Sequence, residues 1–159
     1  MRSTKLPTAA DIMNRSVLTF SPDIAITEAI ERVLKRGYSG APVVDDDHGV
    51  VGVLSENDCI RVLSASAFHG EPDGTVGEHM TKEVVTVRPE TDVFQLVFAF
   101  HKHTFRRVMV TDADDKLVGL ITRRDLLRVL DRIRRERDQP ERASTYEQIA
   151  AQHERDLSE

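Results

Sequence analysis

The chain contains one unit twice. Residues 11–65 and 78–132 can be laid over each other at a constant offset of 67 residues without a gap. The pairs that are identical in this register include turn, core and helix-start positions: Met13/Met80, Thr19/Thr86, Pro22/Pro89, Val43/Val110, Gly52/Gly119, Asp58/Asp125 and Leu63/Leu130. A chance match of apolar runs would not reproduce all these kinds of position, so we expect two copies of one structural unit.

The length and composition indicate what the two units build together. At 159 residues the chain is long enough to bury a core, but each unit alone is small. We therefore expect one two-lobed domain in which neither half folds alone. A content of 40% hydrophobic and 31% charged residues is typical of a soluble globular protein, and a net charge of -5 gives no bias toward nucleic acid.

The cysteine count and the hydropathy pattern indicate a compartment. Cys59 is the single cysteine, so an internal disulfide is excluded. The first ten residues lack the apolar run of a signal peptide, and no long apolar segment follows. We expect a cytoplasmic protein without a membrane partner or a nucleic-acid partner.

Within the first unit, the pattern of apolar and turn residues predicts five elements. We expect a strand over 17–20, a helix whose apolar stripe ends near Gly37, strands over 41–44 and 50–54, and a second helix that Ser55 caps. The segment between the two later strands is rich in Asp and Gly, which indicates a hairpin.

The second unit repeats this order, with expected strands over 84–87, 108–111 and 117–121 and a second helix after Thr122. Each unit is thus β-α-β-β-α, and the fold class is α+β. A unit of this kind leaves one sheet face uncovered, so we expect the two units to pack sheet to sheet as an α/β sandwich.

The expected domain boundaries follow from the repeat. The first repeat takes residues 7–68, a linker rich in Gly and Pro takes 69–77, the second repeat takes 78–132, and a charged tail takes 133–159. Ser144 and Glu147 form a capping-box pattern that predicts a helix in the tail. Its apolar side would carry Tyr146, Ile149, Ala150, His153 and Leu157. A helix docked on its own domain is favoured over one that binds a partner.

Several motifs carry a resemblance to a known family. Segments 11–13 and 78–80 open the units, segment 40–45 follows the first helix, and segments 52–58 and 119–125 both fit G-h-h-S/T-x-x-D, where h is apolar. On these motifs the units resemble cystathionine-β-synthase (CBS) domains, and the pair over residues 7–132 resembles a Bateman module.

The resemblance implies a function. Two repeats would pack around a pseudo-two-fold axis, would bind adenosine-containing ligands in clefts between them, and would assemble as a homodimer. We expect a stand-alone regulatory module for AMP, ADP, ATP or S-adenosylmethionine that signals through a dimer change or an unknown effector protein. The alternative is a ligand-free scaffold for oligomerisation. The sequence offers no catalytic triad and no metal-ligand pair at a recognisable spacing, so we expect neither an enzyme nor a metal or covalent cofactor.

The helix starts after Ser55 and Thr122 are the candidate phosphate sites. A helix N-terminus presents free N–H groups and partial positive charge, and each hydroxyl adds a donor. By the resemblance, Asp58 and Asp125 would accept hydrogen bonds from a ribose. The alternative for both pairs is plain helix capping, which is compatible with ligand contact.

The base needs a flat apolar slot, for which segments 38–42 and 108–110 are candidates together with the strand ends. The candidate ligand residues are Thr19, Tyr38, Ser39, Gly40, Ala41, Pro42, Ser55, Asp58, Thr86, Arg106, Arg107, Val108, Met109, Thr122, Arg123, Arg124 and Asp125.

The resemblance implies that these residues form two clefts. Cleft A would join Ser55 and Asp58 to Thr86, Arg106 and Arg107. Cleft B would join Thr122, Arg123, Arg124 and Asp125 to Thr19, Ser39 and Ala41. Each cleft then holds one arginine pair, although arginine runs on a surface are often only solvated. The repeats also differ where the second has Arg107-Val108-Met109 and the first has Gly40-Ala41-Pro42.

Overall fold

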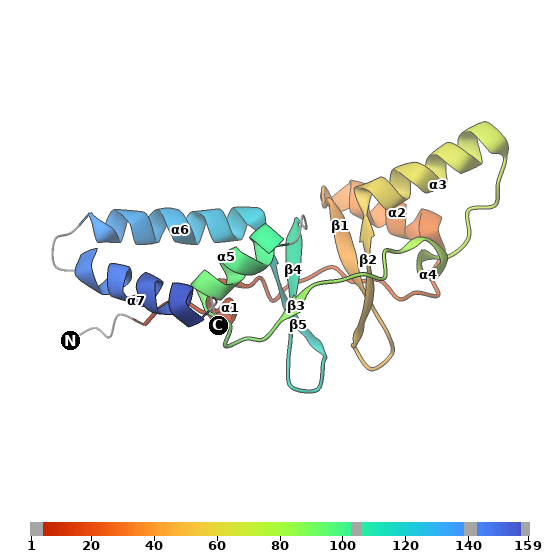
Figure 1. The fold of residues 1–159 in the computed structure, drawn as a ribbon. Coiled ribbons are helices and arrows are strands. Elements are labelled where there is room, and N and C mark those ends of the chain that lie inside the picture. The colour runs from red at the N-terminus through yellow and green to blue at the C-terminus, as the bar shows by residue number, and fades with distance from the viewer. Residues whose placement is uncertain (1–4, 103–105, 139–142, 157–159) are drawn as a thin grey trace.

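Two small β-sheets lie side by side at the centre of the molecule, with helices on the outer side of each (Figure 1). The computed structural model describes residues 5–102, 106–138 and 143–156. The first repeat contains α1 (Ala9–Ile12), α2 (Ile26–Arg36), β1 (Gly40–Val44), β2 (Val50–Ser55) and α3 (Glu56–His69). The second repeat contains α4 (Val76–His79), β3 (Thr86–Val87), α5 (Val93–Lys102), β4 (Arg107–Thr111), β5 (Leu117–Thr122) and α6 (Arg123–Arg137), and α7 (Ala143–Asp156) follows.

Local sequence signals account for the helix boundaries. The stripe of α2 is buried at Ile26, Ala29, Ile30 and Val33, and the helix ends at Gly37, whose φ of 66° is readily adopted by glycine. At the start of α3, Ser55 accepts a hydrogen bond from the Asp58 N–H in a capping box, and Thr122 does the same for α6. These features confirm the expected helices of both repeats.

The sheets differ in size. In the first, β1 pairs with β2 antiparallel; in the second, β3 runs parallel to β4, which pairs antiparallel with β5. The two hairpins carry a bulge at the same repeat position. Val44, Met109 and Leu117 form a buried cluster between the sheets, with Val17, Val50, Val84 and Leu120 around it. The expected α+β class and the sheet-to-sheet packing are confirmed.

The expected strand over 17–20 is wrong as a full strand, because only Phe20 forms a bridge to β1. The reason lies in Pro42. In the second repeat, the Met109 N–H donates to the Val85 carbonyl at 3.1 Å and extends the β3–β4 ladder. Pro42 occupies the equivalent position in β1 and has no N–H to donate, so the first-repeat ladder stops after one bridge.

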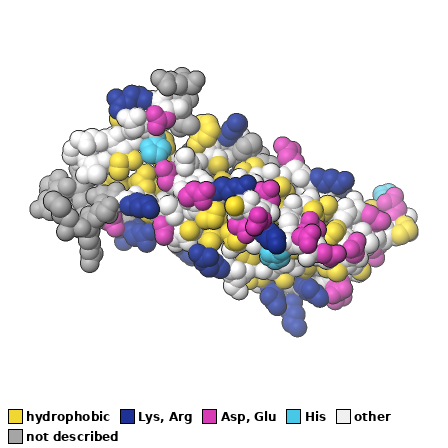
Figure 2. Space-filling view, turned by 90° about the horizontal axis from the view of Figure 1, so that it is seen from below, with side chains coloured by type: hydrophobic (Ala, Val, Ile, Leu, Met, Phe, Trp, Pro, Cys, Tyr) yellow, Lys and Arg dark blue, Asp and Glu magenta, His cyan; other side chains and the backbone are white. Residues whose placement is uncertain are grey.

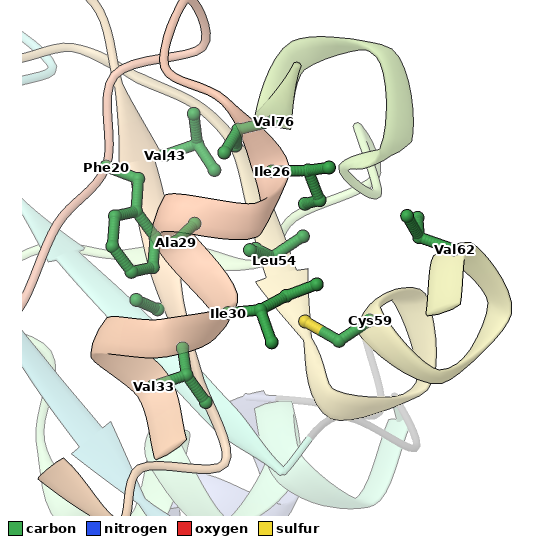
Figure 3. Close-up of a cluster of buried hydrophobic side chains, with 11 residues drawn as sticks. Phe20, Ile26, Ala29, Ile30, Val33, Val43, Leu54, Cys59, Val62 and Val76 are labelled. Carbon is green, nitrogen blue, oxygen red and sulfur yellow. The ribbon is translucent and has the colours of Figure 1, made fainter. Parts of the chain in front are cut away.

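The repeats exchange their first helices. Ala9 of α1 is buried in the core of the second repeat with Val93 and Leu96, and its N–H donates to the Thr91 carbonyl at 2.7 Å. In the same way, Val76 of α4 lies in the core of the first repeat (Figure 3). Each core is therefore completed by the other repeat, which is consistent with the expectation that neither half folds alone. Neither short helix is visible in the sequence pattern, and α4 begins within the expected linker 69–77.

The tail folds back on the second repeat. Helix α7 begins at Ala143, before Ser144, so the expected cap at Ser144 is wrong; Glu147 instead pairs with Arg137 of α6 at 2.8 Å. Tyr146 donates a hydrogen bond to Glu136 at 3.0 Å. A hollow of about 300 Å³ is lined by Tyr146, Ile149 and Ala150 together with apolar residues of α5 and α6. Leu157 lies outside the described residues.

The charged side chains do not separate by sign on the face seen in Figure 2, where acidic and basic groups lie interspersed. Within the part of the chain that the structure describes, no helix has the length and apolar character needed to cross a membrane.

Candidate functional site

A cleft of about 540 Å³ lies between the repeats at the position expected for cleft A. The first repeat contributes the end of β2 and the start of α3, and the second contributes segment 81–85 and the start of β4. The lining residues are Ser39, Val53, Ser55, Glu56, Asn57, Ile60, Thr81, Glu83, Val84, Val85, Arg106, Arg107 and Met109. Cleft A thus combines an apolar surface with a helix N-terminus and two arginines.

The apolar part of cleft A is formed by Val53, Ile60, Val84, Val85 and Met109. These side chains come from both repeats, because β2 and α3 supply two of them and segment 84–85 with β4 supplies the others. A flat apolar surface bordered by backbone polar groups suits an aromatic ring.

Arg107 links the two walls of cleft A. Its guanidinium donates a hydrogen bond to the Ser39 hydroxyl of the first repeat. Burial lowers the pKa of Arg107, while the nearby Glu56 carboxylate raises it and Arg106 lowers it further. A guanidinium stays protonated under these influences. A partly desolvated positive charge therefore faces the cleft, where it favours an anionic ligand group.

Asp58 lies behind the cleft rather than on its surface. Its side chain is 2% exposed, and the carboxylate accepts hydrogen bonds from the Ser55 N–H at 2.9 Å and the Ser55 hydroxyl at 2.8 Å. Thr81 of the second repeat donates to the same carboxylate at 3.3 Å. Asp58 thus caps α3 and ties the repeats together, so the capping alternative describes these contacts.

The structure brings some of the expected residues of cleft A together and leaves others apart. Ser55, Arg106, Arg107 and Met109 line the cleft, and so does Ser39, which the resemblance assigned to cleft B. Three other candidates do not line it: Thr86 is exposed on β3, and Asp58 and Val108 are buried.

The candidates for cleft B are more dispersed. The Asp125 carboxylate accepts from the Thr122 N–H at 2.9 Å and from the Thr122 hydroxyl at 2.8 Å, and its side chain is 26% exposed. Arg123 lines a different hollow, on the outer side between α5 and α6, and Arg124 is exposed. The remaining candidates in the first repeat are the half-buried Thr19, the exposed Tyr38, and the buried Gly40, Ala41 and Pro42.

Gly40 stands where the backbone must come close to its neighbours. It has a φ of 141°, and a Cβ there would meet the Leu54 carbonyl oxygen and approach the Arg107 guanidinium at 3.1 Å. Only glycine fits this position, so Gly40 preserves the path of Arg107 into cleft A.

Sequence reasoning did not predict eight of the lining residues, namely Val53, Glu56, Asn57, Ile60, Thr81, Glu83, Val84 and Val85. One signal was available for Thr81, because it follows the Met80 repeat position that must pack beside β2. The place of Glu83 and the exposure of Ile60 depend on how the two repeats are rotated against each other, which no local pattern encodes.

Comparison with known proteins gives matches in both halves of the chain. The family model of the CBS domain matches residues 9–65 and 76–132. The crystal structure of CBSX2 of Arabidopsis thaliana in complex with AMP is similar, with a TM-score of 0.71 and 28% identity, covering 80% of this chain and 98% of that one. The CBS domain pair of protein MJ0100, in complex with 5′-methylthioadenosine and S-adenosyl-L-methionine, has a TM-score of 0.67 and 25% identity, covering 77% and 98%.

Relatives also include enzymes that contain a similar segment. Inosine-5′-monophosphate dehydrogenase of Methanocaldococcus jannaschii is 28% identical over 120 residues, which is 76% of this chain and 23% of the enzyme. The chain spans 23% to 41% of the length of this dehydrogenase and of two uncharacterized proteins from the same organism.

Proposed function

Because the chain belongs to the CBS domain family, we propose that it is a regulatory module that binds an adenosine-containing ligand in cleft A. The observation that carries this proposal is the convergence, in one cleft between the repeats, of Arg106, Arg107, the start of α3 and an apolar slot. Two similar CBS pairs were crystallised with AMP and with S-adenosyl-L-methionine, and both match this chain over three quarters of its length or more.

The chemistry of the walls assigns an orientation to the ligand. The base lies against Val53, Val84, Val85 and Met109, while an anionic group lies near the two arginines and the α3 N-terminus. A ribose between these ends would reach Asp58 only if that carboxylate exchanged its bond from Thr81 for bonds to the ligand. Because Thr81 belongs to the second repeat, this exchange would couple ligand binding to the contact between repeats.

We further propose that the readout is a homodimer or an effector contact on the outer helices. Leu34 is 74% exposed on α2 and Leu127 is 66% exposed on α6, while Phe68 on α3 is also exposed. Apolar side chains exposed on the outer helices of both repeats are typical of an interface. Replacing Leu34 and Leu127 by Glu should convert a dimer to a monomer in light scattering, whereas Arg36→Glu should not.

We propose neither an enzyme activity nor a nucleic-acid partner for the chain, and we propose that it acts in the cytoplasm. The arginines of α6 support the absence of a nucleic-acid partner, because Arg134 and Arg135 both pair with Asp131 rather than forming an uncompensated basic surface. The module bounds proposed are residues 7–68 and 78–132, with 69–77 as the connection and 133–159 as an accessory tail.

One observation favours a second candidate, a ligand-free scaffold. The Asp58 carboxylate accepts hydrogen bonds from both repeats, from Ser55 and from Thr81, so it has a structural role at the contact between the repeats. Isothermal titration distinguishes the two functions. Wild-type protein should bind AMP or S-adenosylmethionine, Arg106→Ala/Arg107→Ala should weaken AMP binding at least about tenfold because two charge-assisted contacts are lost, and Arg36→Ala should bind as the wild type does. Absence of binding to folded wild-type protein would favour the scaffold.

A further inference from the structure

The first residue of the helix has opposite charge in the two repeats. Glu56 opens α3 and Arg123 opens α6, at equivalent positions of the repeat. The backbone geometry is the same at both, because the Glu56 N–H donates to the Ser39 carbonyl at 3.2 Å and the Arg123 N–H donates to the Arg106 carbonyl at 3.2 Å. The repeat therefore retains the local structure and changes the charge.

In cleft A this difference between the repeats places an acid, Glu56, beside the anion-binding groups. Glu56 lines the cleft together with Arg106 and Arg107, and Glu83 lines it from the other repeat. Two arginines and two glutamates give no net formal charge. The Glu56 carboxylate also acts on Arg107, since it raises the pKa of that guanidinium against the effect of burial.

An acid at the start of a helix changes which anions can bind there. The helix N-terminus and the two arginines attract the first phosphate group. Every additional phosphate brings further negative charge near Glu56, which is exposed at the cleft, and like charges there repel each other. An acid beside the phosphate-binding groups therefore disfavours ligands with more than one phosphate, without adding affinity for any other ligand.

We propose that cleft A selects adenosine ligands with a single phosphate over those with a polyphosphate chain, and that Glu56 is the residue that makes the distinction. This inference rests on the proposed function of cleft A as an adenosine site.

The test compares AMP, ADP and ATP by isothermal titration with the wild type, Glu56→Gln and Glu71→Gln. Glu71 is exposed in the loop that follows α3, so Glu71→Gln makes the same change in net charge at the far end of that helix. Arg107→Ala identifies which fitted site is cleft A. Glu56→Gln keeps the backbone contacts, so the variant should fold, and circular dichroism checks this.

At cleft A the wild type should bind AMP at least about tenfold more tightly than ATP. Glu56→Gln should reduce this AMP/ATP affinity ratio by about fivefold, because the variant gains affinity for ATP. Glu71→Gln should leave the ratio unchanged. An AMP/ATP affinity ratio that Glu56→Gln leaves unaltered, while Arg107→Ala still weakens binding, would overturn the inference alone. Binding that responds to neither Glu56→Gln nor Arg107→Ala would place the ligand outside cleft A, and the proposed function would fail with the inference. If the folded wild type bound no adenosine ligand, the proposed function itself would fail, and the inference would fail with it.

Discussion

Met13 occupies the space that a side chain on Gly119 would need. A Cβ built on Gly119 would meet the sulfur, Cγ and Cβ atoms of Met13, which lies on the segment after α1 of the other repeat. Met80 stands in the same relation to Gly52 in β2, where its sulfur would lie 2.6 Å from the added Cβ. The methionine and the glycine are each the same residue in the two repeats, so the same methionine–glycine contact between the repeats occurs twice.

This contact predicts that alanine is poorly tolerated at both glycines, and less well at Gly52. A Cβ on Gly52 would also lie 2.9 Å from the backbone carbonyl of Thr81, which cannot move aside as a methionine side chain can. Gly52→Ala should reduce the free energy of unfolding by about 1–3 kcal/mol, as overpacking does, and Gly119→Ala by less. Urea denaturation measures both, and Met13→Ala should partly restore the Gly119→Ala variant. Equal losses at the two sites would contradict this account.

The exchange of α1 and α4 predicts that the halves are interdependent. A fragment of residues 1–70 lacks Val76 and Met80 of its own core, and a fragment of residues 71–159 lacks Ala9 and Met13. Each fragment alone should be largely unfolded by circular dichroism, and an equimolar mixture should regain structure. A fragment that unfolds cooperatively on its own would show that the exchanged helix is dispensable.

The repeat register predicted the element order, the hairpins and the α+β class because these depend on local patterns. The length of the first strand of repeat one was overestimated. Its apolar pattern is that of a strand, but Pro42 in the neighbouring strand β1 cannot donate the hydrogen bond that would extend the ladder. The short helices α1 and α4 were missed because four residues carry no periodicity, and because their partners lie in the other repeat.

For the site, the sequence predicted which residue types would meet but not how deeply they lie. Ser55, Arg106 and Arg107 do meet in cleft A. Asp58 and Asp125 occupy equivalent positions and looked the same in the sequence, yet Asp58 is far more buried. The difference arises from Thr81, which donates to Asp58, while the equivalent Asn14 accepts a hydrogen bond from the Ser16 N–H.

This asymmetry predicts unequal costs of substitution at the two aspartates. Asp58→Ala removes a buried carboxylate that accepts hydrogen bonds from Ser55 and from Thr81 of the other repeat, and should lower the free energy of unfolding by about 1–3 kcal/mol. Asp125→Ala removes only a half-exposed member of a capping box and should cost about 0.5–1 kcal/mol. Thermal denaturation compares them, with Asp114→Ala on the exposed hairpin loop as the control. A larger loss of stability for Asp125→Ala than for Asp58→Ala would contradict the unequal roles of the two carboxylates.

Docking of α7 should depend on pH through His153. The side chain of His153 lies 2.8 Å from the Asp92 carboxylate and against the Phe94 ring, and its pKa is raised by the hydrogen bond to Asp92, by the Ile149 carbonyl and by the Asp156 charge. Because the pKa of His153 is raised in the folded state, protonated His153 stabilises the docked α7. This stabilisation is complete below the ordinary histidine pKa of about 6.5 and is lost as pH rises through the folded pKa.

Hydrogen exchange of segment 143–156, corrected for intrinsic rates, should therefore show stronger protection at acid pH than at alkaline pH. His153→Gln should remove the dependence while Tyr146 still contacts Glu136. Identical protection at both pH values in the wild type would exclude His153 as the source.

Backbone amide shifts in NMR spectra test most directly whether an adenosine ligand binds between the repeats in cleft A. On addition of AMP, the account predicts perturbation at residues 55–57 of the first repeat together with 83–85 and 106–109 of the second, and little change in α7. Shifts confined to one repeat, to the outer helices, or absent at saturating AMP would contradict it.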